Sequence, residues 1–223
     1  MIAALAPRSR DPKLASPARL IARVALAVGT LGALASSAAF AQGNVGARPP
    51  VLLNNPSFLD LAFSTKSVEL GYRQLTSRED GYFGLNVLAN EDSDLVVSAR
   101  LLRVGALVGV PTRLGVGVAA FGAALDEPED DGDSMDAYAL ALVGMAEYDL
   151  NTPTRSMLSA ELSLAPDIAT FGDADNLIDF KLRVSVEISR AATAFCGYHV
   201  LEVDLDPDYS IDKRFHIGVS LGL

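Results

Sequence analysis

The chain has 223 residues, of which 50% are hydrophobic, and a formal net charge of −10 at pH 7. This length is sufficient for one domain or one closed barrel. The acidic balance excludes nucleic acid and other polyanions as partners, and the single cysteine, Cys196, excludes an internal disulfide framework.

Residues 1–41 are predicted to be a secretory signal peptide, exported by the Sec route and then removed. Its basic region comprises Arg8, Arg10, Lys13, Arg19 and Arg23. A short apolar run follows at 24–35, and the sequence Ala-Phe-Ala at 39–41 presents small residues for cleavage before Gln42. The alternative, an uncleaved N-terminal anchor, is disfavoured because the apolar run is short for a spanning helix.

Removal of this signal would leave a more acidic chain. Five of the 18 basic residues but only one of the 28 acidic residues lie in 1–41, which leaves 13 basic and 27 acidic side chains and a net charge of −14. Residues 42–56 are punctuated by Gly, Asn and Pro and are predicted to be a linker. Residues 57–223 are then predicted to form one domain.

In residues 57–223, apolar and polar residues alternate with a period of two, which is typical of β-strands. The clearest run is 177–189, where six apolar side chains from Ile178 to Ile188 share one face and charged or polar side chains share the other. The runs 156–164 and 214–223 repeat the pattern. Weaker runs complete a set of ten strands, at 58–64, 67–75, 82–90, 94–103, 114–125, 137–149 and 193–205.

An even number of strands brings both chain ends to one side, as single-chain outer-membrane barrels require. We therefore predict an all-β fold, an antiparallel up-and-down transmembrane β-barrel of about ten strands. Eight strands are the alternative, because residues 64–67 leave a very tight connection between the first two runs.

The connections alternate in length, as in outer-membrane barrels. With the C-terminus in the periplasm, the turns 151–155 and 189–193 lie inside. The long acidic segments lie outside, at 126–136, 166–176 and 206–212. Segment 105–113 departs from the pattern, since it is long and apolar where a short inner turn is expected, and a longer preceding strand would account for it.

Alternating strands also fit a soluble β-sandwich or a lipocalin-like barrel, but two features favour a membrane. The last strand stays apolar on one face to Leu223, and a soluble edge strand of this kind would be sticky. Lys181, Arg183 and Glu187 would be costly in a dry core but can pair inside a small barrel, which fills its lumen with side chains. The polar network expected in the lumen comprises Glu161, Asp179, Lys181, Arg183, Glu187, Arg214 and His216.

Aromatic residues near the predicted strand ends suit girdles at the two membrane interfaces. They are Tyr82, Tyr138, Tyr148, Phe171 and Tyr209. The alternative is the general preference of aromatic residues for strands.

The pattern resembles the YfaZ family of predicted outer-membrane proteins. Residues 161–167, Glu-Leu-Ser-Leu-Ala-Pro-Asp, are similar to a family stretch of Glu, aromatics and Ala/Ser-Pro-Asp that closes a strand, and residues 197–199, Gly-Tyr-His, resemble the family's Gly-Tyr-Arg. Leu164, His199 and Leu223 depart from the usual aromatic residue, Arg and Phe. The resemblance implies a barrel in the outer membrane of a Gram-negative bacterium, and it implies no activity.

Residues 115–120, Gly-Val-Gly-Val-Ala-Ala, match the Gly-x-Gly-x-x-Ala pattern of dinucleotide sites. That pattern should follow a strand and open a helix. Here it lies inside a run of period two, so these are interpreted as strand glycines, and no cofactor is expected.

The loop 126–133 carries Asp130, Asp131 and Asp133, which are candidate ligands for a divalent metal. Their spacing does not fit an EF-hand. A solvated acidic loop is favoured over the alternative, in which divalent ions bridge the loop to lipopolysaccharide.

His199 and His216 are the only histidines and lie on neighbouring predicted strands. They are the candidate catalytic residues, since some small outer-membrane barrels modify lipids with a His–Ser pair. A histidine in a polar lumen network is the favoured alternative. Cys196 is expected to be buried or to face lipid.

The leading hypothesis is a monomeric structural or binding barrel with a filled polar lumen. Its expected partners are outer-membrane lipid, lipopolysaccharide and, during biogenesis, the barrel-assembly machinery. The alternatives are a lipid-modifying enzyme, a narrow porin-like channel and a soluble periplasmic β-protein.

Overall fold

The computed structural model describes residues 57–76, 80–126, 134–172, 174–204 and 209–223. The predicted signal peptide at 1–41, the predicted linker at 42–56 and most of the acidic loop at 126–133 lie outside the described residues. Within this part of the chain, no helix has the length and apolarity needed to span a membrane.

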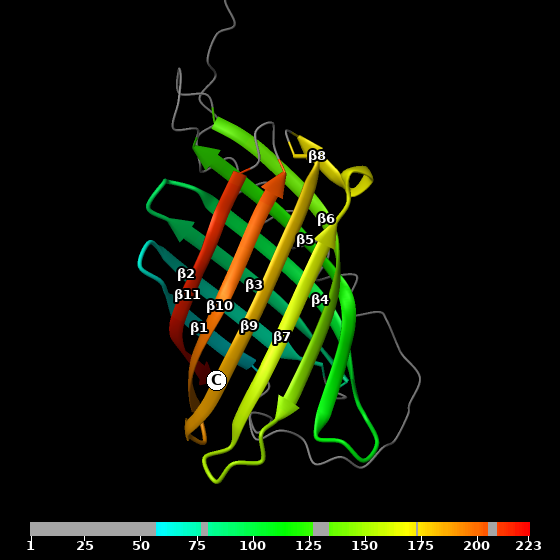
Figure 1. Ribbon diagram of the computed structural model, residues 1–223, viewed down its shortest axis with the longest axis vertical. Coiled ribbons are helices and arrows are strands. Elements are labelled where there is room, and N and C mark those ends of the chain that lie inside the picture. The colour runs from blue at the N-terminus through cyan, green and yellow to red at the C-terminus, as the bar shows by residue number, and fades with distance from the viewer. Residues whose placement is uncertain (1–56, 77–79, 127–133, 173, 205–208) are drawn as a thin grey trace, which may run out of the picture.

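Eleven strands are found in the described residues, and all of their pairings are antiparallel (Figure 1). They are β1 (Ser57–Phe63), β2 (Ser67–Leu75), β3 (Gly81–Asn90), β4 (Leu95–Ala106), β5 (Thr112–Asp126), β6 (Ser134–Asp149), β7 (Ser156–Ala165), β8 (Thr170–Gly172), β9 (Asn176–Ser189), β10 (Ala192–Asp204) and β11 (Tyr209–Gly222). The sheet closes because β1 pairs with β11, with Phe58 opposite Gly222. The predicted antiparallel barrel of ten strands is confirmed, and eight strands are too few.

The eleventh strand, β8, was not predicted. It follows a single 3-10 turn at Asp167–Ala169 and pairs with residues 137–139 of β6, beyond the point where β7 ends. Because β8 only extends the line of β7, the next barrel strand, β9, pairs directly with β7. Segment 166–176 is therefore not purely a loop.

Three other boundaries differ from the sequence prediction by three residues or more. β4 continues to Ala106, so segment 105–113 contains strand ends and a short turn, as a longer preceding strand would give. β6 begins at Ser134, inside the segment predicted as an outer loop. β11 begins at Tyr209, inside the segment predicted as a loop.

A β-bulge explains the missed start of β11. The register of β10 against β11 shifts between Leu201 and Glu202, which pair with Asp212 and Ser210 respectively and leave Ile211 unpaired. Ile211 and Asp212 are consequently both buried. Two successive inward side chains break the period of two on which the prediction depended.

Closure gives the barrel two distinct ends. The end that holds the start of β1 and the end of β11, here called the terminal end, carries the connections 107–111, 150–155 and 190–191. The opposite end, here called the loop end, holds the end of β5, the start of β6 and segment 166–172. The predicted inner turns and the predicted outer segments are thus sorted to opposite ends of the barrel.

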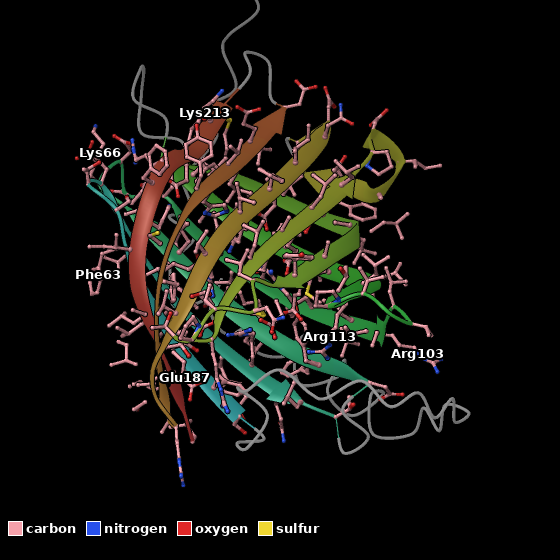
Figure 2. The ribbon with its side chains drawn as sticks, turned by 60° about the horizontal axis from the view of Figure 1, so that its bottom comes forward. Phe63, Lys66, Arg103, Arg113, Glu187 and Lys213 are labelled. Carbon is pink, nitrogen blue, oxygen red and sulfur yellow. The ribbon has the colours of Figure 1, made fainter. Side chains whose placement is uncertain are left out.

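The two faces of the barrel wall have opposite character. Many side chains that point away from the lumen are large, apolar and exposed, and Figure 2 shows Phe63 among them. Cys196 also lies on this outer face and is exposed. Outward-facing charged side chains such as Arg103 and Lys213 lie near the strand ends (Figure 2).

The lumen is filled by side chains in layers. Towards the loop end, an apolar cluster includes Leu125, Val143, Val203 and Ile211, all nearly inaccessible to solvent. Inward-facing alanines on β5 and β6 leave room for these larger side chains. The middle of the lumen is polar, and it contains the candidate site.

Candidate functional site

The middle of the lumen holds a group of ionisable side chains that we call the charged layer. Within the described residues it draws on seven strands, and alternation along each strand turns these side chains inward. The charged layer comprises Asp60, Glu69, Arg73, Arg100, Glu161, Asp179, Lys181, Arg183, His199, Asp212, Arg214 and His216.

Ion pairs connect strands that are not neighbours in the barrel. Lys181 on β9 pairs with Glu69 on β2. Arg100 on β4 pairs with Glu161 on β7, and its second terminal nitrogen lies 3.8 Å from Asp179. These pairs cross the lumen and hold facing walls together.

Asp60 on β1 forms ion pairs with two arginines. The Arg73 Nε lies 2.9 Å from its Oδ2, and Arg183 Nη1 lies 3.5 Å from the same oxygen. The Arg183 guanidinium also lies over the ring of Phe195, 3.9 Å from its centroid, in cation–π geometry. Asp60 and Phe195 together hold the Arg183 side chain in the lumen.

Two imidazoles and two carboxylates form a second group within the charged layer. His199 Nε2 lies 2.7 Å from Asp179 Oδ1, and His216 Nε2 lies 2.7 Å from Asp212 Oδ2. His199 Nδ1 lies 3.2 Å from the same Asp212 oxygen. The two rings are 5.5 Å apart between centroids.

The permanent charges of the charged layer balance. Five carboxylates and five Lys or Arg side chains belong to it, so it is neutral when both imidazoles are neutral. Balance matters here because an unpaired buried ion costs several kcal/mol. Removing any one of these charges would therefore leave an opposite charge of the layer buried without its partner.

Six of the seven residues of the predicted lumen network belong to the charged layer: Glu161, Asp179, Lys181, Arg183, Arg214 and His216. The seventh, Glu187, does not. It lies near the terminal end of β9, where its carboxylate is 3.6 Å from Arg155. Arg214 is at the margin, with Nη1 3.8 Å from Asp212 Oδ1.

The sequence reasoning missed Asp60, Glu69, Arg73, Arg100 and Asp212. The first four lie on strands with weak alternation, so the inward face was not evident, and Asp212 lies in the segment predicted as an outer loop. The available signal was a charged residue flanked on both sides by apolar or small residues, as Arg100 is by Ala99 and Leu101.

The predicted aromatic girdle is wrong for Tyr82. This residue points into the lumen, where its hydroxyl donates to Glu161 Oε2 at 3.1 Å. Tyr148 and Phe171 are exposed, and Tyr138 is half-buried. The side chain of Tyr209 lies outside the described part of the chain, as do the candidate metal ligands Asp130, Asp131 and Asp133.

The candidate catalytic residues, His199 and His216, are buried in the charged layer. In the described part of the chain, the close polar neighbours of both imidazoles are carboxylates and not hydroxyls. A His–Ser pair of the kind found in lipid hydrolases is not assembled among these residues.

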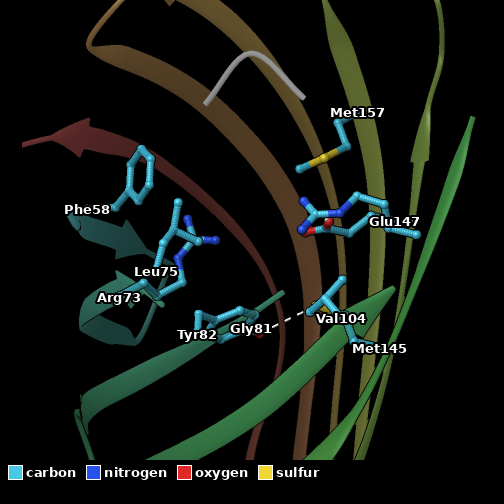
Figure 3. A pocket seen from close by; sticks show the side chains of 10 residues that line it. Phe58, Arg73, Leu75, Gly81, Tyr82, Val104, Met145, Glu147 and Met157 are labelled. Atoms are coloured by element: carbon cyan, nitrogen blue, oxygen red, sulfur yellow. Dashed lines mark hydrogen bonds and ion pairs between the residues drawn. The ribbon is translucent and has the colours of Figure 1, made fainter. Parts of the chain in front are cut away.

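Two small cavities border the charged layer. The first, of about 40 Å³, lies towards the terminal end, and Figure 3 shows Phe58, Leu75 and Met157 around it with Arg73 on its wall. The second, of about 60 Å³, lies among Asp60, Arg100 and Lys181. Such volumes hold a few water molecules.

No family model and no curated protein matches the chain. Among solved structures, the outer membrane channel DcaP of Acinetobacter baumannii is similar, with 14% sequence identity and a TM-score of 0.34 over 74% of this chain and 54% of that chain. This chain thus spans about half the length of that channel. At this level of similarity, nothing said of the channel transfers to this chain.

Proposed function

We propose that this protein is an integral β-barrel of the outer membrane of a Gram-negative bacterium, with a lumen closed by its own charged layer. Its role is structural or binding, and it is not a path for general diffusion. The main support for a closed lumen is the ion pair between Lys181 and Glu69, which joins β9 to β2 across the interior.

The outer face supports the location in a membrane. Phe215, Ile217 and Leu142 are apolar side chains that the barrel leaves largely exposed. A large contiguous apolar surface is unfavourable in water, whereas a closed barrel leaves no unpaired strand edge in lipid. The position of charged side chains near the strand ends fits a band of this kind.

The filled lumen supports the absence of a wide pore. An apolar cluster seals it towards the loop end, and the charged layer fills its middle. A narrow porin-like channel is the alternative, and it would require these ion pairs to open.

Purified, refolded protein in a planar bilayer tests the closed lumen. We expect no conductance steps from the wild type, and we expect steps from the double variant Arg100→Ala/Lys181→Ala wherever that variant retains the heat-modifiable gel mobility of a folded barrel. Reproducible steps from the wild type would establish the channel instead.

Fractionation tests the location. The protein should remain with outer membranes after carbonate washing, and it should migrate differently on gels when boiled. A protein that washes off and migrates identically with and without boiling is a soluble β-protein.

The remaining assignments belong to the same proposal. They are membership of the YfaZ family, removal of residues 1–41 after Sec export, insertion by the barrel-assembly machinery, contact with lipopolysaccharide and a monomeric state. Residues 161–167, on which the family resemblance depends, close β7 at the loop end, and residues 197–199 lie in β10, the penultimate strand.

A further inference from the structure

We propose that His199, Asp212 and His216 bind one divalent transition-metal ion, of the class of Zn²⁺, on the inner wall formed by β10 and β11. The proposal concerns the lumen alone and holds whether or not the barrel lies in a membrane. Its outcome can therefore be distinguished from that of the proposed function.

The three side chains converge at one point of the lumen. Asp212 Oδ2 lies 2.7 Å from His216 Nε2 and 3.2 Å from His199 Nδ1. One ligand atom from each residue falls within 4.8 Å of the others. Zn²⁺ bonds of about 2.0–2.2 Å place ligand atoms about 3–4 Å apart, so small side-chain rotations suffice to form the site.

The hydrogen bonding of His199 leaves a place for a cation. Asp179 can only accept at 2.7 Å from Nε2, so Nε2 carries the ring proton. In a neutral ring the Nδ1 lone pair then faces the carboxylate of Asp212, and two acceptors oppose each other. Either a second proton or a metal ion must lie between them.

Unsatisfied polar atoms favour the metal. Exposure is 4% for His199, 1% for Asp212 and 5% for His216. Each of these residues nevertheless keeps a buried polar atom without a hydrogen bond: His199 Nδ1, Asp212 Oδ1 and His216 Nδ1. A second proton on His199 would satisfy Nδ1 alone, whereas a metal ion bound by His199 Nδ1 and by both carboxylate oxygens of Asp212 would also satisfy Asp212 Oδ1.

The surroundings match those of a metal-binding histidine. Such a histidine usually donates its other N–H to a carboxylate, which fixes the ring, and Asp179 accepts from His199 in this way. Glu69 Oε2 lies 4.0 Å from His199 Nδ1 and offers a further oxygen from the opposite wall. Two imidazoles with carboxylate oxygens form a ligand set that suits Zn²⁺ and related ions.

Metal titration of the folded protein tests the site. The protein carries no histidine tag, is stripped with EDTA and is refolded in detergent. Zn²⁺ affinity is then measured by competition with a chromogenic chelator. We expect one Zn²⁺ per chain, and we expect weakening by more than about 100-fold in Asp212→Asn and His216→Gln, each of which removes a direct ligand. Asp179→Asn, which removes only the positioning carboxylate, should weaken binding by about 10–100-fold.

A matched control uses an acidic cluster elsewhere in the chain. Neutralising Asp130, Asp131 and Asp133 together to Asn should leave Zn²⁺ affinity unchanged. Loss of binding in this loop variant, with full binding in the lumen variants, would overturn the proposal, and so would a folded wild type that binds no stoichiometric Zn²⁺.

A second measurement needs no variant. One equivalent of Zn²⁺ should shift the imidazole NMR resonances of both histidines of the wild type. Unchanged resonances at saturating Zn²⁺ contradict the site even where a lumen variant fails to fold.

Discussion

Glu69 on β2 and Lys181 on β9 are 112 residues apart in the chain and form an ion pair across the lumen. Both side chains are largely buried, and the path from β2 to β9 around the barrel passes through β1, β11 and β10. The pair therefore fixes the distance between facing walls, which no backbone hydrogen bond does.

Lys181→Met should destabilise the barrel by about 3–5 kcal/mol, because it leaves the carboxylate of Glu69 buried without its partner. The double variant Glu69→Gln/Lys181→Met should cost less than the sum of the two single variants, since it leaves neither charge unpaired. Urea unfolding in detergent, followed by heat-modifiable mobility, measures all three variants. Strict additivity would show that the pair is not coupled.

Ile217→Arg tests the outer face. Ile217 lies in the central part of β11 and is 67% exposed. In lipid, an arginine there should cost about 2–4 kcal/mol. The control is Ile188→Arg, near the terminal end of β9 and 65% exposed, where the cost should be about 0–1 kcal/mol.

Unfolding from vesicles gives both free energies. In a soluble barrel, both outward substitutions would stay within about 0.5 kcal/mol of the wild type. Equal small costs at the two positions would therefore exclude a lipid-facing wall.

Gly117→Ala tests the interpretation of the Gly-x-Gly-x-x-Ala run as part of a strand. A Cβ at Gly117 would lie 1.9 Å from the Leu101 carbonyl oxygen and 2.8 Å from the Leu102 Cα, both backbone atoms of β4. We expect a loss of about 1–3 kcal/mol from this overpacking. Gly144→Ala on β6, where a Cβ meets nothing within 4 Å, should be neutral or stabilising by up to about 1 kcal/mol.

Unfolding midpoints in urea compare the stabilities of the two glycine variants with that of the wild type. Similar midpoints for Gly117→Ala and the wild type would remove the steric account of this glycine.

Strands with one fully apolar face were predicted well from sequence. The run 177–189 became β9 with nearly the same bounds, because alternating Ile, Phe, Leu and Val fix its conformation and form its outward face, which turns the charged residues between them inward. β11 was predicted too short, because the bulge at Ile211 turns two successive residues inward. β8 was missed because a strand of three residues is too short to show the alternation of apolar and polar residues.

The charged layer was predictable only in part. Lys181 and Arg183 lie on the strand with the clearest alternation, and this alternation predicted that both side chains point inward. Their partners Glu69 and Asp60 lie on weak strands, and no sequence signal links residues more than 100 positions apart. Which carboxylate meets which base depends on the closure of β1 against β11 and on the register that results.

The accessibility of Cys196 tests the central claim most directly. It is the only cysteine of the chain and lies on the outer face of β10, opposite Val184 of β9 and Ile217 of β11. In folded protein inserted into lipid vesicles, the thiol should resist a charged, water-soluble maleimide, because lipid covers it and excludes the charged reagent. It should react fully once urea unfolds the barrel. Rapid labelling of the folded, vesicle-bound protein would contradict a lipid-facing wall and with it the outer-membrane barrel.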